Sequence, residues 1–196
     1  MEKKIIALTL FAMSSAASAG GFFGAGLGQS SADVGPQYSV PGLSISDTDT
    51  AFKIFGGYEF NENIAIEGGY TYLGEFGGSY TYTDGLYLYT DSEMVETGAL
   101  YVAAVATIPL GPVSLFGKAG FAHWFADYRY YDDWYGYTWT DSATGIDPVV
   151  GAGVKFNIGQ GFQVRGEFER YMDIGDPNVT GQSDVDVISI NAVLKF

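Results

Sequence analysis

The feature that most constrains this chain is a two-residue alternation of apolar and polar side chains. In the last stretch, Ile188, Ile190 and Leu194 fall on one face, while Ser189 and Asn191 fall on the other. Alternation with this period predicts an extended strand whose two faces meet different surroundings. Eight such segments are predicted, at residues 21–30, 51–60, 63–76, 96–108, 113–127, 147–158, 161–172 and 185–196.

Alternation is also expected in a soluble β-sandwich, which buries one face of each strand. Strand length separates the two classes. The predicted strands run to about ten residues or more, the length that spans a bilayer when tilted, whereas soluble strands usually have about five or six. Their polar faces also carry charges of both signs, and no apolar stretch in residues 20–196 is long enough for a transmembrane helix.

The connections alternate between short and long. Tight turns are expected at residues 61–63, 110–112 and 159–160. Long connections are expected at residues 31–50, 77–95, 128–146 and 173–184. Outer-membrane barrels have short periplasmic turns and long outer loops, and a sheet in lipid must close because an unpaired edge finds no water there. The sequence therefore predicts an all-β fold, an eight-stranded antiparallel up-and-down transmembrane β-barrel with both termini in the periplasm.

The first 19 residues have the three parts of a secretory signal peptide. A charged start is followed by an apolar run at residues 5–13 and by a small-residue cleavage site ending at Ala19. The run is too short for a membrane-anchoring helix, which is the alternative interpretation. We expect a signal peptide at 1–19 and one barrel domain at 20–196.

Charge excludes some partners. Without Glu2, Lys3 and Lys4, the chain carries 22 acidic and 7 basic side chains, a net charge of −15. That balance argues against nucleic acid and against simple electrostatic attraction to anionic lipid headgroups. Cysteine is absent, so an exported chain must be stabilised without disulfides.

Eight charged side chains on the polar strand faces are expected to point into the barrel lumen, because a charge facing lipid costs about 2–4 kcal/mol at the midplane. They are Lys53, Glu59, Glu67, Lys118, Lys155, Arg165, Glu167 and Glu169. They either neutralise one another as a structural ionic plug or line a selective pore. The narrow interior of an eight-stranded barrel favours the plug, with Glu67 paired to Lys118 or Arg165.

Aromatic and acidic residues are concentrated in two of the long connections. The examples are Tyr80, Tyr82, Tyr87 and Tyr89, and then Asp132, Asp133, Trp134, Tyr135, Tyr137 and Trp139. The rings form either an interfacial girdle with strands extended above the membrane, which is favoured, or a contact surface. Asp47-Thr48-Asp49 and Asp132-Asp133 lack the spacing of a calcium loop, so no metal site is predicted.

Catalysis is not expected. The only histidine, His123, lies among aromatic residues on the outward face of its predicted strand, where packing is the more common role. The sequence indicates no catalytic residue and no cofactor-binding site. An acidic pair in the loops is the remaining route to activity.

Several motifs resemble the OmpA-type outer-membrane barrel family. They are GGYEFNENIAIEGGYTYLGEF (56–76), FGKAGFAHWFAD (116–127), VRGEFERYMDIGD (164–176) and ISINAVLKF (188–196). The resemblance covers the mature chain and is weakest in the loops. It implies lumen ion pairs at Glu67, Lys118, Arg165 and Glu167, and a terminal Phe196 that acts as the signal to the barrel-assembly machinery. Longer family members carry a peptidoglycan-binding domain after the barrel, and no such segment is present here, so a cell-wall tether is not expected.

The leading functional hypothesis is a non-enzymatic barrel, integral to the outer membrane among lipid and lipopolysaccharide. It would anchor acidic, tyrosine-rich loops for surface interaction or adhesion. The first alternative is a small porin-like protein that passes ions or solutes. The second is a lipid-modifying enzyme.

Overall fold

A computed structural model describes residues 20–32, 43–83, 85–159, 161–177 and 181–196. The predicted signal peptide and its cleavage site lie outside these residues. No helix in the described part of the chain is long and apolar enough to cross a membrane.

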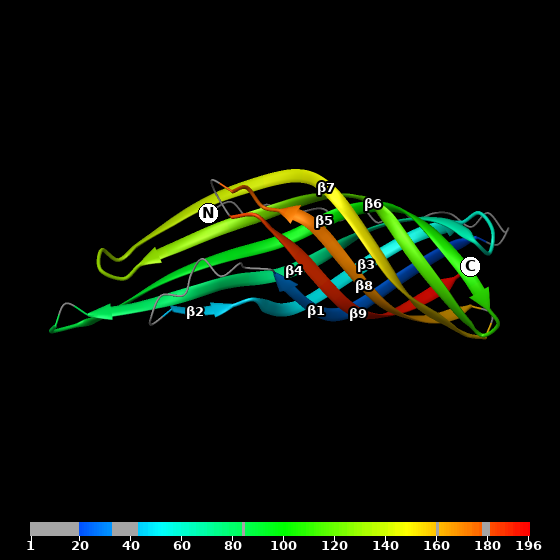
Figure 1. Ribbon diagram of the computed structural model, residues 1–196, viewed down its shortest axis with the longest axis horizontal. Helices are drawn as coiled ribbons and strands as arrows, with labels where there is room; N and C mark the ends of the chain where they lie inside the picture. The colour runs from blue at the N-terminus through cyan, green and yellow to red at the C-terminus, as the bar shows by residue number, and fades with distance from the viewer. Residues whose placement is uncertain (1–19, 33–42, 84, 160, 178–180) are drawn as a thin grey trace.

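The fold is an antiparallel barrel of eight strands, each hydrogen-bonded to its neighbours around the ring (Figure 1). The barrel strands are β1 (Gly21–Ala32), β3 (Thr48–Glu59), β4 (Ile64–Thr83), β5 (Leu88–Leu110), β6 (Val113–Asp132), β7 (Tyr137–Ile158), β8 (Phe162–Ile174) and β9 (Ser183–Lys195). The first and last strands pair from Phe22↔Lys195 to Ala32↔Val185, which closes the ring. The predicted fold class is confirmed.

One strand was not expected. β2 (Leu43–Ser46) lies in the first long connection and pairs with residues 77–80 of β4, beside the place where β3 pairs lower on the same strand. It adds to the edge of the sheet above the barrel without becoming part of the ring.

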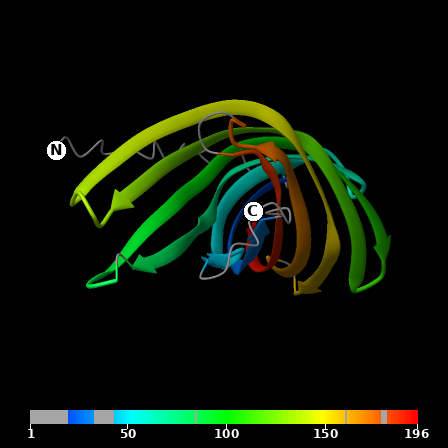
Figure 2. The same ribbon diagram turned by 60° about the vertical axis from the view of Figure 1, so that its left-hand side comes forward.

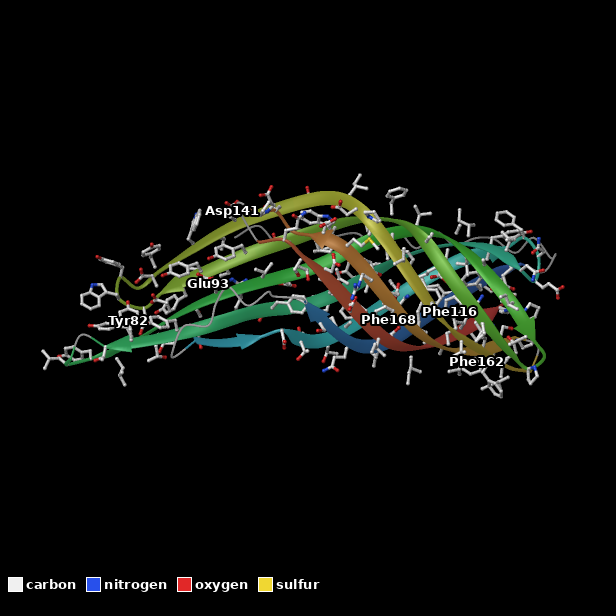
Figure 3. The ribbon with its side chains drawn as sticks, in the orientation of Figure 1. Tyr82, Glu93, Phe116, Asp141, Phe162 and Phe168 are labelled. Carbon is white, nitrogen blue, oxygen red and sulfur yellow. The ribbon has the colours of Figure 1, made fainter. Side chains whose placement is uncertain are left out.

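Side chains alternate between lipid and lumen as the two-residue pattern predicts (Figure 3). Ile188, Ile190 and Leu194 are 66%, 71% and 57% exposed, whereas Ser189 and Asn191 between them are buried. Phe55 breaks the polar pattern of its strand face and is buried inside the barrel.

Charged residues mark the upper limit of the outward apolar band. Above Leu100 on β5 and Phe121 on β6, the outward faces carry Glu96 and Asp127. These two residues lie directly opposite each other in the strand register. Because charges facing lipid are unfavourable, this level is the outer rim of the membrane-spanning wall.

Two predicted long connections are wrong as loops. Residues 77–95 and 128–146 continue the four strands β4 to β7 beyond the rim and leave only short turns between them. The cause is local: Tyr and Thr alternate along these segments, and both favour strands. We call these paired residues the extension. Figure 2 shows it projecting to the left on one side of the barrel, while β8, β9 and β1 are shorter.

The opposite end of the barrel has tight turns, as predicted at residues 61–63 and 110–112. Gly111 has a φ of 84°, a conformation that glycine adopts without strain. A β-bulge in β4 lies between Tyr72 and Gly74, where Gly74 has a φ of 110°.

Candidate functional site

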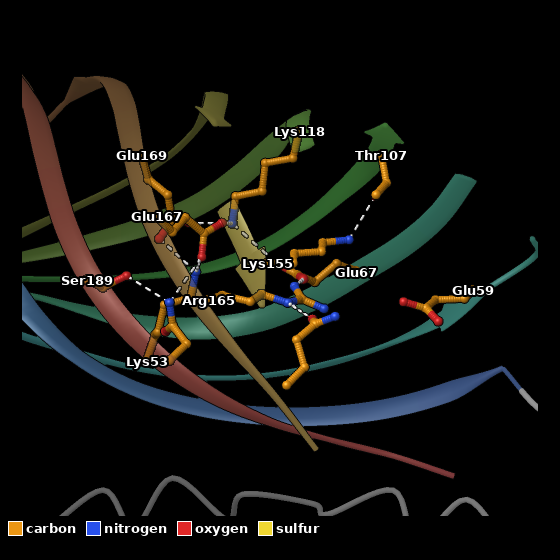
Figure 4. A network of polar contacts seen from close by, with 12 residues as sticks. Lys53, Glu59, Glu67, Thr107, Lys118, Lys155, Arg165, Glu167, Glu169 and Ser189 are labelled. Atoms are coloured by element: carbon orange, nitrogen blue, oxygen red, sulfur yellow. Dashed lines mark hydrogen bonds and ion pairs between the residues drawn. The ribbon is translucent and has the colours of Figure 1, made fainter. Parts of the chain in front are cut away.

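The centre of the lumen holds three cations and three carboxylates whose side chains are at most 1% exposed. Lys53 comes from β3, Glu67 from β4 and Lys118 from β6, while Arg165, Glu167 and Glu169 project from β8. The inward phase of each strand brings six residues from four strands together inside the barrel (Figure 4). We call these six residues the lumen cluster.

Each cation contacts a carboxylate from another strand. Lys53 Nζ lies 2.8 Å from Glu167 Oε2 and 2.7 Å from Glu169 Oε2. Lys118 Nζ contacts Glu167 Oε1 at 2.8 Å, Glu169 Oε1 at 2.5 Å and Glu67 Oε1 at 3.3 Å. The formal charges of these five residues and Arg165 balance, which offsets the desolvation that burial imposes on each ion.

Glu67 contacts both of the partners suggested for it from sequence. Arg165 Nη1 donates to Glu67 Oε2 at 2.6 Å, and Lys118 reaches the other oxygen of the same carboxylate. Tyr101 also donates to Glu67, at 2.8 Å, so two oxygens serve three donors.

Aromatic rings enclose the lumen cluster. The Arg165 guanidinium carbon lies 4.8 Å from the ring centroid of Phe22 and 5.2 Å from that of Phe55. Lys118 Nζ lies 4.6 Å from the centroid of Tyr101. Contacts of this kind stabilise a desolvated cation through the negative face of the ring.

The other two predicted lumen residues lie toward the periplasmic end and stay apart from the cluster. Lys155 is buried, donates to Thr107 Oγ1 at 2.8 Å and makes no ion pair with any described carboxylate. Glu59 pairs with Lys195 at 2.8 Å, where both side chains are about a quarter exposed.

Sequence reasoning missed the neutral polar residues that surround the lumen cluster. Gln163 accepts from Arg165 Nε at 2.8 Å, and Tyr171 shares a hydrogen bond of 2.8 Å with Thr71. Asn191 donates to Ser189 at 3.0 Å. All these side chains lie on the inward phase of their strands, and that phase was the available signal.

The extension carries the other concentration of functional side chains. Its rings contact one another in series: Tyr80 and Tyr82 are stacked with centroids 5.8 Å apart, Tyr82 and Tyr89 are stacked at 5.6 Å, and Tyr89 meets Trp134 at a tilt, at 4.5 Å. Figure 3 labels Tyr82 and Glu93, which lie on the extension. These rings lie above the rim, so they extend strands as expected and do not form the girdle at bilayer level.

His123 lies on the outward face of β6, as expected. Its Nδ1 donates to the Gly145 carbonyl oxygen at 2.9 Å. Among the described residues, no group of three or more His, Asp or Glu side chains is placed to hold a metal ion. A hollow of about 380 Å³ lies on the outer face of the extension near the rim, lined by Glu75, Met94, Glu96, Asp127, Tyr128, Arg129, Thr140, Asp141 and Ser142.

Comparison with curated proteins identifies relatives of known family. The chain is 29% identical over 149 residues to outer membrane protein A of Escherichia fergusonii, an alignment that covers 72% of this chain. The protein from Shigella dysenteriae is 28% identical over the same length. The aligned region is 39% of either relative's own length.

Solved structures show the same fold. Ail of Yersinia pestis, crystallised in complex with the heparin analogue sucrose octasulfate, has a TM-score of 0.55 at 18% identity and covers 91% of this chain and 99% of its own. Neisserial surface protein A has a TM-score of 0.55 at 16% identity and covers 90% and 97%. The family model of the OmpA-like transmembrane domain matches residues 16–196. Fold and family match agree, and the chain belongs to the OmpA-like transmembrane domain family, whose members are integral to the outer membrane.

Proposed function

We propose that the protein is a non-enzymatic outer-membrane anchor, closed by the lumen cluster, that presents the extension outside the cell as a contact surface. The observation that carries this proposal is the extension itself. Four strands continue beyond the rim as a paired sheet. A barrel that only filled the membrane would not need them.

The lumen cluster supports an anchor over a pore. Its six side chains are packed against rings and pair with one another inside an eight-stranded wall. Water and ions passing through would have to separate pairs that exclude solvent, and breaking a buried pair costs about 3–5 kcal/mol. A steady conducting pathway is therefore disfavoured.

The charge and composition of the extension support a role in contact. Tyr and Trp are favoured at binding surfaces because they present large, rigid, amphipathic area. Trp139 is 57% exposed, and Tyr137 is 51% exposed. His123 donates its Nδ1 proton to the Gly145 carbonyl oxygen, which supports a packing role for this side chain.

Adhesion of cells is the direct test. Cells displaying the intact protein are compared with cells in which residues 77–95 and 128–146 are replaced by short turns. We expect the trimmed barrel to reach the outer membrane at equal level and attachment to protein-coated surfaces to fall. Equal attachment by both strains, at matched surface levels, would overturn the display function.

The final strand is proposed to carry the assembly signal. Phe196 follows β9, and its amide donates to the Gly21 carbonyl oxygen at 3.0 Å, at the seam where the barrel closes. Phe196→Ala is expected to slow appearance of folded protein in the outer membrane, while Leu194→Ala on the same face serves as the control. Equal assembly rates for the wild type and Phe196→Ala would contradict this role.

A further inference from the structure

The two faces of the extension differ in chemistry although both lie beyond the rim. The inner face continues the lumen side of the barrel, because β5, β6 and β7 pair without a register shift. It carries Tyr80, Tyr82, Tyr89, Asp91, Glu93, Tyr128, Tyr130, Asp132, Tyr137, Trp139 and Asp141. Above the rim, the outer face is mainly Ser and Thr: Ser79, Thr81, Thr90, Ser92, Thr138, Thr140 and Ser142, with Met94, Arg129 and Tyr131.

Contacts within the inner face fix its rings and acids in place. Tyr130 donates to Asp91 Oδ2 at 3.2 Å, and the other oxygen of that carboxylate accepts from the Asp133 amide at 3.0 Å. Tyr128 meets Trp139 edge to face, with centroids 6.2 Å apart. The surface is preorganised, which lowers the entropy lost on binding.

The inner face has no basic side chain to balance its carboxylates. Arg129 is the only Lys or Arg among residues 77–95 and 128–146, and its register places it on the outer face. Exposed rings beside carboxylates attract Lys and Arg twice, through ion pairing and through cation–π contact. A sulfated ligand such as the one bound to Ail would be repelled here, as would a second copy of this acidic chain.

The extension also has a free strand edge. β7 pairs with β8 only from Val149 onward, and no described residue pairs with residues 137–144 on the side away from β6. Two residues show which backbone N–H and C=O groups of β7 face the free edge. Pro148 has no amide to donate to β6, and the Ser142 amide is satisfied locally by Asp141 Oδ1 at 2.8 Å. The even-numbered residues of β7 therefore direct their backbone N–H and C=O groups toward the free edge, away from β6.

We propose that the extension binds an extended polypeptide segment rich in Lys and Arg, which adds as a strand to the free edge of β7. Its backbone would bond to the edge-facing backbone groups of residues 138–144 other than the Ser142 amide, and alternate basic side chains would lie over the inner face near Trp139 and Asp141. This inference rests on the proposed display function and names the chemistry of the partner.

Binding is measured by fluorescence polarisation with the full mature protein, refolded in a nonionic detergent. The probe is a labelled synthetic peptide in which Lys alternates with Thr. The matched peptide has Glu in place of Lys, and a third has N-methyl groups on alternate backbone nitrogens. We expect saturable binding of the Lys peptide alone, weakened by added salt.

Variants separate the inner face from the outer face and from the edge. The double variant Trp139→Ala with Asp141→Asn is expected to bind the Lys peptide about tenfold more weakly. Thr140→Ala, on the outer face of the same strand, should bind like the wild type. Thr140→Pro removes one edge-facing amide and should weaken binding, and each variant is checked for the heat-dependent mobility of a folded barrel.

Three outcomes overturn the proposal. They are equal binding of the Glu peptide, equal binding of the N-methylated peptide, and equal loss in Thr140→Ala and the double variant. Cell attachment that depends on the extension, together with no binding of the Lys peptide, would refute the partner and leave the display function standing. Peptide binding without a loss of attachment after trimming would refute the display function instead.

Discussion

At the scale of single residues, the lumen cluster depends on which partner each charge meets. Lys53 touches two carboxylates, whereas Lys155 touches a threonine hydroxyl. Both ammonium groups are buried on the inward face of the wall. The two lysines are therefore alike in burial but differ in ion pairing, so mutating each of them separates the effect of burial on stability from the effect of ion pairing.

Lys53→Met is expected to destabilise the folded barrel by about 3–5 kcal/mol, because Glu167 and Glu169 lose a partner in a buried site. Lys155→Met should be close to neutral, since it removes a buried charge that has no described ion pair. Urea unfolding in lipid vesicles, followed by tryptophan fluorescence, measures both. A loss at Lys155 as large as that at Lys53 would show that pairing is not what stabilises the cluster.

An exposed pair gives a second comparison. Arg170 holds Asp186 through two hydrogen bonds of 2.6 Å, yet the two side chains are 44% and 30% exposed. Arg170→Met should lower the free energy of unfolding by only about 0–1 kcal/mol, because solvent screens the pair. A loss comparable to that of Lys53→Met would contradict this ranking.

Tyr130 allows a test by pH. Its burial, its hydrogen bond to Asp91 and the negative charge of that carboxylate raise the pKa of Tyr130 to about 12. The folded state therefore keeps the phenol proton at a pH where the unfolded chain, with an ordinary pKa near 10, loses it. This contribution to stability is complete below pH 10 and disappears as the pH rises toward about 12.

The measurement is a difference titration of tyrosinate absorbance between the wild type and Tyr130→Phe. Asp91→Asn is expected to move the Tyr130 midpoint down, since it removes the negative charge and the carboxylate acceptor. An unchanged midpoint in Asp91→Asn would mean that Asp91 does not hold the proton on Tyr130.

At the scale of elements, the strands were predictable because each carries its own alternation. The same rule located the inward residues, including the exception at Phe55. The expected strand bounds were too short at residues 77–95 and 128–146, which were assigned to long connections although their alternating Tyr residues favoured strands extended above the membrane. Alternation indicates that these segments can form strands, and cross-strand pairing decides how far the strands continue.

The β-bulge in β4 is the element feature most open to mutation. At Gly74, a Cβ atom would lie 2.8 Å from Asp49 Cβ and 2.9 Å from Ser30 Oγ, in a backbone with a φ of 110°. Gly74→Ala should therefore destabilise the barrel by about 1–3 kcal/mol. In Gly117→Ala, the new Cβ would come no closer than 3.8 Å to its nearest neighbour. Urea unfolding should rank the two variants in that order, and the reverse ranking would contradict the strain argument.

At the scale of the whole molecule, closure of the barrel and the pairing of charges inside it depend on different kinds of information. Closure could be predicted because lipid forbids an open sheet edge. The pairing inside the lumen could not be assigned from sequence, because it depends on the stagger between strands. Glu67 illustrates this, since two alternative partners were proposed and the stagger brings both within reach.

The closed lumen predicts an electrically silent protein. In planar bilayers, the wild type should show no steady open channel, because the lumen cluster fills the ring. Purified protein should also change electrophoretic mobility on boiling, as closed barrels do. A stable conductance in the wild type would favour the porin-like alternative over the anchor.

The barrel wall is uneven in height, with β4 to β7 tall and β8, β9 and β1 low. At about 3.3 Å per residue, the five residues of β6 beyond Asp127 extend roughly 17 Å along the strand past the rim. The tall strands cover one flank of the inner face of the extension, so a ligand reaches that face from the side of β8, β9 and β1. Crowding by neighbouring sugars beside β8, β9 and β1 would therefore limit the access of ligands to the inner face more strongly than crowding on any other side of the protein.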